Sequence, residues 1–259
     1  MNYRLEYNPA CSRSRWLACF DLLGTRQLIG SDGGFQVFLV YERAVREVTH
    51  WISRLPQIEH AWFSDTFLMY SKNDAASDFV AMDMISRWFV HFLLLAEIPL
   101  RGAVACGDFY ADTSAQAYFG KALVEAYEFA EDQDWIGFLL CPSAVARLEE
   151  VGLPASERLN YAYFDIPFKK AMSAKRLPAC ILGDWARTNG ENQAVRTLKR
   201  MKEKQLEGSI AGKYENTITF IERNQRSVAA SGQPAAPPNG GLASTSGNCG
   251  AFGRPSSVS

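Results

Sequence analysis

The sequence lacks a long apolar run, a strong net charge and an apolar leader. Its longest apolar stretch, residues 88–96, is too short to span a bilayer, and residues 1–15 have no signal-peptide core. Lys and Arg number 27 against 28 Asp and Glu, which gives a net charge of −1. No positive field therefore favours a nucleic-acid polymer or an anionic membrane. We expect a cytoplasmic protein whose partners are small molecules or other proteins.

Motifs built on cysteine, histidine or glycine are also missing. The six cysteines form no CxxC pair and have no histidine at zinc-ligand spacing, which excludes a zinc ribbon and argues against a disulfide framework. His50, His60 and His91 do not cluster. No P-loop, GxGxxG or Ser-His-Asp motif is present. At 259 residues with 47% hydrophobic content, the chain can still bury a sizeable core in one or two domains.

Hydrophobic periodicity predicts alternating strands and helices. Strands are expected at 14–20, 58–63, 67–70, 100–106, 135–140, 161–166 and 179–182, and helices at 35–55, 75–96, 119–132 and 142–151. The two middle strands, 58–63 and 67–70, are expected to form a hairpin. This order favours an α+β protein of the ferredoxin-like kind, with helices packed on one face of a sheet.

Composition divides the chain into four parts. Residues 1–13 are an N-terminal extension and 14–188 the main folded domain. The charged segment 189–226 is expected to form exposed helices interrupted at Gly208 and Gly212. Residues 227–259 are rich in Ser, Gly, Pro and Ala and cannot offset the entropy of ordering, so a flexible tail is expected.

Two aspartates carry the chemistry that the sequence indicates. Asp21 ends an apolar strand, and Asp65 lies near the tip of the expected hairpin. Either one alone is more typical of a cap or a turn. If the strand pairs with the hairpin, the two carboxylates converge and are suited to two Mg²⁺ or Mn²⁺ ions, with the Leu22 carbonyl as a further ligand. Such a site would bind a nucleoside triphosphate through backbone N–H groups between Leu22 and Thr25. It would activate a ribose hydroxyl for attack on the α-phosphate.

Four segments, in this order, resemble class III nucleotide cyclase domains, and most of all the pyrimidine cyclases of the bacterial Pycsar antiphage system. The segments are FDLLG (20–24), SDT (64–66), PLRGAVACG (99–107) and YFGKALVEAYE (118–128). The resemblance covers about residues 15–185. It implies a homodimer that converts UTP or CTP into a 3′,5′-cyclic nucleotide after phage infection, and this messenger would act on a separate effector protein.

The resemblance also implies roles for single residues. Asp21 and Asp65 correspond to the metal aspartates and Leu22 to the backbone metal ligand. The residues that match the triphosphate loop are Phe20, Leu23, Gly24 and Thr25. Arg101 is a candidate for base recognition or for balancing phosphate charge; its alternative interpretation is a solvated arginine at a strand end.

One departure from the purine cyclases keeps alternatives open. Their helix after the fourth motif supplies an Asn and an Arg to the reacting phosphate, whereas residues 120–132 contain neither and offer only Lys121. Overall likeness favours UTP, with cyclic UMP as the product. The alternatives are a cytidylate cyclase making cyclic CMP, an inactive cyclase-fold sensor that binds nucleotide, and a polymerase-like or dinucleotide-forming enzyme.

Overall fold

The structure is a computed structural model, and it describes residues 13–24, 34–155, 160–170, 172, 175–182, 187–188, 191–204 and 208–230. Thr25, most of the expected N-terminal extension and the expected tail from residue 231 onward lie outside the described residues.

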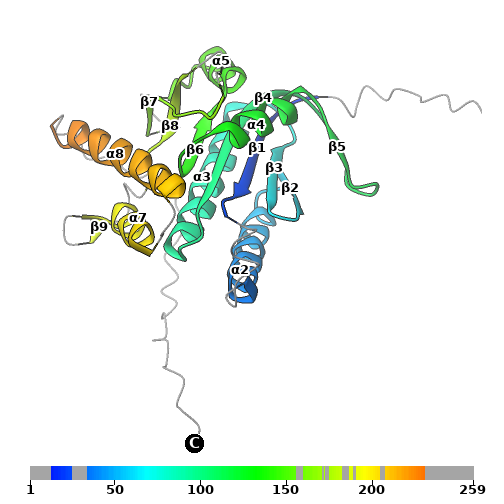
Figure 1. Ribbon diagram of the computed structural model, residues 1–259. Helices are drawn as coiled ribbons and strands as arrows, with labels where there is room; N and C mark the ends of the chain where they lie inside the picture. Colours follow the sequence, from blue (N-terminus) through cyan, green and yellow to red (C-terminus); the bar gives the residue numbers. More distant parts are fainter. Residues whose placement is uncertain are drawn as a thin grey trace, which may run out of the picture.

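Strands and helices alternate along the chain much as the periodicity predicts (Figure 1). The strands are β1 (Arg13–Leu22), β2 (Ile58–Phe63), β3 (Thr66–Ser71), β4 (Leu100–Asp112), β5 (Ala117–Phe119), β6 (Gly137–Leu140), β7 (Tyr161–Asp165), β8 (Arg176–Cys180), β9 (Arg187–Thr188) and β10 (Glu191–Asn192). The helices are α2 (Gly34–Ile52), α3 (Ala76–Leu95), α4 (Lys121–Asp132), α5 (Pro142–Glu150), α7 (Gln193–Lys204) and α8 (Gly208–Ala230). Among the described helices, none combines the length and the apolar character that a membrane crossing requires.

The main sheet has the strand order β2-β3-β1-β4-β6-β8-β7, with β5 paired to β4. Its first four strands come from the unit β1-α2-β2-β3-α3-β4, and their spatial order β4-β1-β3-β2 is antiparallel throughout. This is the ferredoxin-like arrangement, so the expected α+β fold is confirmed. Strand β6 adds to it in parallel with β4.

Strand β1 is buried on both faces, which explains its continuous apolar sequence. On one face, Trp16 and Phe20 pack against Phe79 and Phe89 of α3, with ring centroids 4.8 and 5.5 Å apart. Side chains alternate along a strand, so Asp21 points to the opposite face. Each face of β1 must therefore be packed against another element of the fold.

Helix α4 covers that opposite face. Its inner side is built from the small residues Ala122, Ala126 and Ala130, all buried, which let it lie close to β1 and β4. The expectation of helices on one face only is therefore wrong: α2 and α3 lie on one face of the sheet and α4 on the other. The small alanine side chains permit the close approach of α4 to the sheet.

Two further differences concern segment ends. Strand β4 continues six residues past the predicted end and forms a projecting hairpin with β5 (Figure 1). Helix α8 runs through Gly212 and on to Ala230, beyond the expected start of the tail. Its inner face buries Tyr214 and Phe220, and α7 buries Leu198, so these helices are not merely exposed.

Close packing between β1 and β4 gives a test of the fold. A Cβ added at Gly102 would lie 2.3 Å from Phe20 Cδ1 and 2.9 Å from the Cys19 carbonyl oxygen. Gly102→Ala is therefore expected to lower the free energy of unfolding by about 1–3 kcal/mol, measured by urea unfolding. The matched control is Gly212→Ala, where no atom lies within 4 Å of the added Cβ. This change is expected to stabilise α8 by about 0.5–1 kcal/mol, and equal effects at the two sites would contradict the packing described.

Candidate active site

Asp21 and Asp65 occupy neighbouring positions at one end of the sheet. Strand β1 pairs with β3, and Asp21 lies opposite Thr66, the residue after Asp65. The Leu22 N–H donates to the Asp65 carbonyl oxygen at 3.2 Å. The predicted pairing of the first strand with the hairpin is confirmed, and it brings the two aspartates together across adjacent strands.

The β2–β3 turn fixes where Asp65 lies. The turn has two residues, Ser64 and Asp65, and Ser64 adopts the left-handed region with φ of 55°. The indole Nε1 of Trp62 donates to the Ser64 carbonyl oxygen at 2.9 Å. A short turn with such support holds its backbone in one position, which suits a residue that must meet a partner on another strand.

Arg101 contacts Asp21 directly from the next strand. The two residues are paired across β4 and β1, and Nε and Nη2 of Arg101 both donate to Asp21 Oδ2, at 3.1 and 2.8 Å. Nη1 donates to the carbonyl oxygens of Glu131 and Gln133 at the C-terminal end of α4. Only 10% of the Arg101 side chain is exposed. Every nitrogen of the guanidinium therefore has a fixed acceptor.

These contacts change the interpretation of Arg101. A solvated arginine at a strand end, the alternative weighed above, is contradicted by its burial. A direct role in reading a base or balancing a phosphate remains a prediction. In this structure the guanidinium links Asp21 to α4 instead.

The electrostatics of Asp21 reflect opposing effects. Burial raises the pKa of Asp21 above its ordinary value, and the nearby Asp65 carboxylate also raises it. Hydrogen bonds and charge from Arg101, and the charge of Lys169, act in the opposite direction. A carboxylate held in this balance gains from any added cation.

Lys169 and Tyr41 are site residues that the sequence reasoning missed. Lys169, between β7 and β8, donates from Nζ to the Glu131 carbonyl oxygen at 2.8 Å, and burial and Arg101 lower its pKa. Tyr41 on α2 is 4% exposed, and its hydroxyl has no hydrogen-bond partner among the described residues. Burial, Asp65 and Asp21 raise the pKa of Tyr41. Both residues are remote from the aspartates in sequence, so no local pattern could indicate them.

The expected triphosphate loop is only partly described. Phe20 is buried on the α3 face, away from Asp21, and packs on Phe89 and Phe138, so its side chain supports the core. The Leu22 and Leu23 N–H groups donate to the carbonyl oxygens of Asp65 and Pro99. Gly24 is exposed with φ of 74°. The two leucine amides are thus engaged within the protein rather than directed at a ligand, and Thr25 lies outside the described residues.

Lys121, the cation considered above in place of the missing Asn and Arg, lies at the wrong end of α4. It is exposed at the first residue of the helix, whereas the last turn contacts Arg101. The rise of an α-helix separates those ends by about 15 Å. Lys121 therefore does not reach Asp21 of its own chain.

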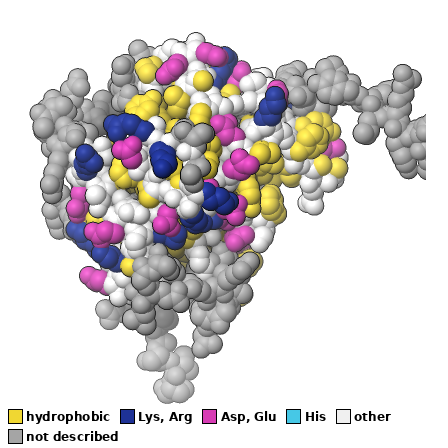
Figure 2. Space-filling view, turned by 45° about the horizontal axis from the view of Figure 1, so that its top comes forward, with side chains coloured by type: hydrophobic (Ala, Val, Ile, Leu, Met, Phe, Trp, Pro, Cys, Tyr) yellow, Lys and Arg dark blue, Asp and Glu magenta, His cyan; other side chains and the backbone are white. Residues whose placement is uncertain are grey.

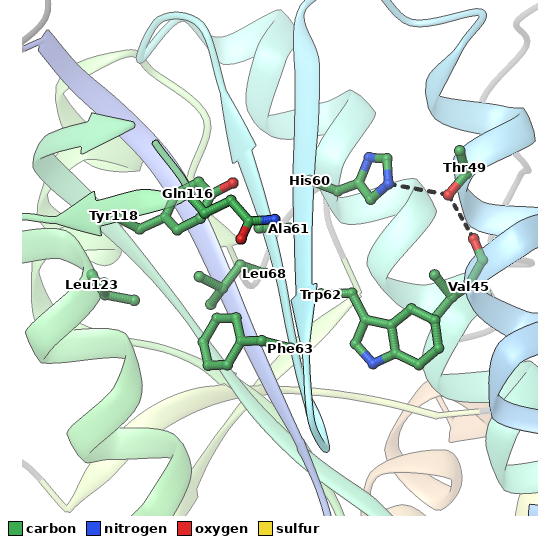
Figure 3. Close-up of a pocket in the computed structure, with 10 residues that line it drawn as sticks. All are labelled: Val45, Thr49, His60, Ala61, Trp62, Phe63, Leu68, Gln116, Tyr118 and Leu123. Carbon is green, nitrogen blue, oxygen red and sulfur yellow. Dashed lines mark hydrogen bonds between the residues drawn. The ribbon is translucent and has the colours of Figure 1, made fainter. Parts of the chain in front are cut away.

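A groove runs along the edge strand β2 beside the site (Figure 3). Thr49, His60 and Trp62 line it on one side of the strand, and the His60 ring nitrogen lies 3.1 Å from Thr49 Oγ1. Phe63 and Tyr118 line it on the other side. Neither Asp21 nor Asp65 lines the groove, so it lies next to the aspartates without containing them.

The donor set fits divalent ions that are shared with a substrate. Among the described residues, no group of three or more His, Cys, Asp or Glu could hold a metal. The site instead offers two carboxylates. Arg101 occupies Asp21 Oδ2, and no donor to Oδ1 is recorded within the described part of the chain. Mg²⁺ is commonly held by one or two carboxylates together with substrate phosphates and water, so this set suits it or Mn²⁺.

Comparisons with known proteins give structural similarity alone. No family model and no curated protein matches the sequence. Among solved structures, the chain is similar to adenylate cyclases from Trypanosoma brucei in their monomeric state, with 14% identity, 70% of this chain and 92% of that chain covered, and a TM-score of 0.47. It is also similar to the guanylate cyclase domain of RhGC from Catenaria anguillulae in complex with GTP, with 7% identity, 64% of this chain and 94% of that chain covered, and a TM-score of 0.46. A third similar structure is the adenylyl cyclase CyaB from P. aeruginosa, with 8% identity, 65% of this chain and 92% of that chain covered, and a TM-score of 0.45. At such low values, residue roles must come from this chain's own geometry.

The Arg101–Asp21 pair predicts a pH-dependent loss of stability. Arg101→Gln leaves the partly buried Asp21 carboxylate without its counter-charge and is expected to cost about 2–3 kcal/mol at pH 8. Removing Arg101 raises the pKa of Asp21 further above its unfolded value. A carboxyl whose folded pKa is raised loses stability as pH rises through the interval between the two values. The loss relative to the parent should therefore be clearly smaller at pH 4 than at pH 8, measured by urea unfolding.

The control for this measurement is Arg46→Gln. Arg46 pairs with Glu42 on the surface of α2, and 77% of its side chain is exposed. Its removal should cost no more than about 0.5 kcal/mol at either pH. An equal loss for Arg101→Gln at both pH values would show that charge pairing with Asp21 is not its cause.

Proposed function

We propose that this chain is a metal-dependent nucleotide cyclase. The observation that carries the proposal is the meeting of Asp21 and Asp65 across β1 and β3, next to a buried arginine. Two carboxylates so placed suit a pair of Mn²⁺ or Mg²⁺ ions that also bind a nucleoside triphosphate. The bound ions would supply Lewis-acid activation of the ribose 3′-hydroxyl and charge neutralisation at the leaving pyrophosphate.

Four residues of the chain have proposed roles in holding the metal ions and the triphosphate. Asp65 presents its carboxylate from a two-residue turn, and Asp21 offers Oδ1 while Arg101 holds Oδ2. The Leu22 carbonyl adds a backbone oxygen from the same strand end. Lys169, whose side chain is exposed, places its ammonium group on the side of the site where α4 ends. Together these residues orient a triphosphate so that its α-phosphate faces the ribose hydroxyl.

The substrate is proposed to be UTP, with 3′,5′-cyclic UMP and pyrophosphate as products. The support is the resemblance of the four sequence segments to pyrimidine cyclases of antiphage defence, which also motivates a cytoplasmic setting and a separate effector protein. CTP, giving cyclic CMP, is the alternative substrate. The two bases differ at one exocyclic group, O4 or N4, so one acceptor or donor in the pocket decides between them.

A homodimer is part of the proposal. Several large apolar side chains on the sheet edge, the hairpin and α4 are exposed, among them Phe63, Phe119, Val124 and Tyr127. Hydrophobic side chains gather on the right of Figure 2, where the β4–β5 hairpin projects in Figure 1. Exposed apolar groups of this kind mark interaction surfaces. In such a dimer, residues from both chains would complete one pocket, and a twofold pair would give two equivalent sites.

A second candidate is an inactive cyclase-fold sensor. The observation in its favour is that α4 contains no Asn or Arg. Such a protein would gain thermal stability from a nucleoside triphosphate and metal without forming a product.

The deciding experiment incubates the protein with each of the four NTPs and Mn²⁺ and identifies products by mass spectrometry. We expect a cyclic pyrimidine nucleotide and pyrophosphate. Asp65→Ala should lower the rate by at least about a hundredfold, because it removes a proposed ligand of the metal ions. Asp165→Ala is the matched control. Its exposed carboxylate forms an ion pair with the exposed Arg176 on the neighbouring strand, so activity should not change.

Three outcomes would count against the proposal. An Asp65→Ala chain as active as the parent removes the metal role. Stabilisation by NTP and metal without product favours the sensor. A linear or two-nucleotide product indicates polymerase-like or dinucleotide chemistry on the same kind of fold.

A further inference from the structure

Helix α8 contacts the segment that links α4 to β6. Lys213, Asn216, Thr217 and Phe220 have the i, i+3, i+4, i+7 spacing of one helix face. Each of them bonds to or packs on Asp134–Ile136, here called the connector, which Gln133 joins to the C-terminal end of α4. This face of α8 is therefore directed at the connector rather than at solvent.

The individual contacts are short and mostly buried. Thr217 Oγ1 accepts from the Ile136 N–H at 2.9 Å and lies 3.0 Å from the Ile136 carbonyl oxygen. Asn216 Nδ2 donates to the Asp134 carbonyl oxygen at 3.0 Å, and Lys213 forms an ion pair with the Asp134 carboxylate. The Phe220 and Trp135 rings meet edge to face at 5.2 Å. Every residue of the connector is thus held by α8.

Gln133, the residue before the connector, joins it to Arg101. Gln133, fully buried, accepts from Arg101 Nη1 through its carbonyl oxygen at 3.4 Å. The Gln133 side chain donates to the Gly102 carbonyl oxygen at 2.9 Å and accepts from the Trp135 indole. Arg101 in turn donates to Asp21, so a continuous series of contacts runs from α8 through the connector, Gln133 and Arg101 to the Asp21 carboxylate.

We propose that α8 is a positioning element of the active site: it clamps the α4–β6 connector, and through Gln133 and Arg101 it sets the orientation of the Asp21 carboxylate. The division of the chain into a catalytic domain and a separate C-terminal helical segment then does not hold for function. Lys213, Asn216 and Thr217 touch no reacting atom and act only through other residues. This inference rests on the proposed metal site.

The test measures Mn²⁺ binding rather than turnover. Mn²⁺ is titrated into the full chain with α,β-methylene-UTP, and in parallel with α,β-methylene-ATP; neither analogue can release pyrophosphate. Bound Mn²⁺ is followed by electron paramagnetic resonance at a temperature where every variant is folded. Thr217→Val should weaken Mn²⁺ binding about fivefold, the size of effect that changes along a network of packed and hydrogen-bonded residues have. Thr217→Ser, which keeps the hydroxyl, should restore it.

Two further variants separate positioning from general stability. Glu222→Gln breaks the α8 pair with Lys199, which is partly exposed, and should leave Mn²⁺ binding unchanged. Asn216→Ala replaces Thr217→Val if the latter does not fold. The double variant Asn216→Ala/Arg101→Lys should weaken Mn²⁺ binding by less than the product of the two single effects. Both substitutions act through the same series of contacts, from α8 through Gln133 and Arg101 to Asp21.

The outcomes separate this inference from the proposed function. No Mn²⁺ binding by the parent with either analogue, or equal binding by Asp21→Ala, overturns the metal site itself. Tight binding by the parent, with Thr217→Val or Asn216→Ala indistinguishable from Glu222→Gln, overturns the role of α8 alone. Full additivity with Arg101→Lys would also overturn the proposed route.

Discussion

A buried guanidinium must satisfy all of its donors inside the protein, and Arg101, on β4, does so with partners from two other elements, β1 and the C-terminal end of α4. It bonds to Asp21 on β1 while its own backbone pairs within β4, and it bonds to the carbonyl oxygens that end α4. A slip of one residue between β1 and β4 would put Arg101 and Asp21 on opposite faces of the sheet. Strand register, helix position and carboxylate orientation are therefore fixed together. The α4 carbonyl oxygens, which have no partner within their helix, gain one at the same point.

The sequence predicts the parts of this arrangement that depend on local patterns. The apolar run before Asp21 and the two short runs around Asp65 lead to β1 and the β2–β3 hairpin, because continuous burial and a tight turn each leave a nearby signal. The partner of Arg101 has no such signal, since it depends on the pairing of strands far apart in the chain. For the same reason, α4 on the second face of the sheet, Lys169 and the buried hydroxyl of Tyr41 could not be foreseen.

Helix α8 illustrates a different difficulty. Its segment is rich in charged and polar residues, and such composition is typical of an exposed helix. Thr217 is nevertheless fully buried, because its hydroxyl accepts from the Ile136 N–H and has two backbone carbonyl oxygens, those of Ile136 and Lys213, within 3.0 Å for its proton. Buried polar side chains are hydrogen-bonded as a rule, and here the partners are main-chain groups that hydropathy does not register. A boundary drawn from composition near residue 188 therefore separates segments that the folded protein joins.

The charges around the site explain why metal ions are central to the proposed reaction. Asp21 and Asp65 are balanced by Arg101 and Lys169, so these four side chains together leave no excess positive charge for a triphosphate. Arg101 is also fully engaged with Asp21 and α4, and it cannot turn toward a phosphate without leaving a partly buried carboxylate unpaired. A nucleoside triphosphate brings about four negative charges, which two divalent ions would neutralise. The missing Asn and Arg on α4 increase this dependence. The proposed reaction therefore needs divalent cations because Arg101, the buried arginine of the site, is bonded to Asp21 and α4 and does not bind the phosphates.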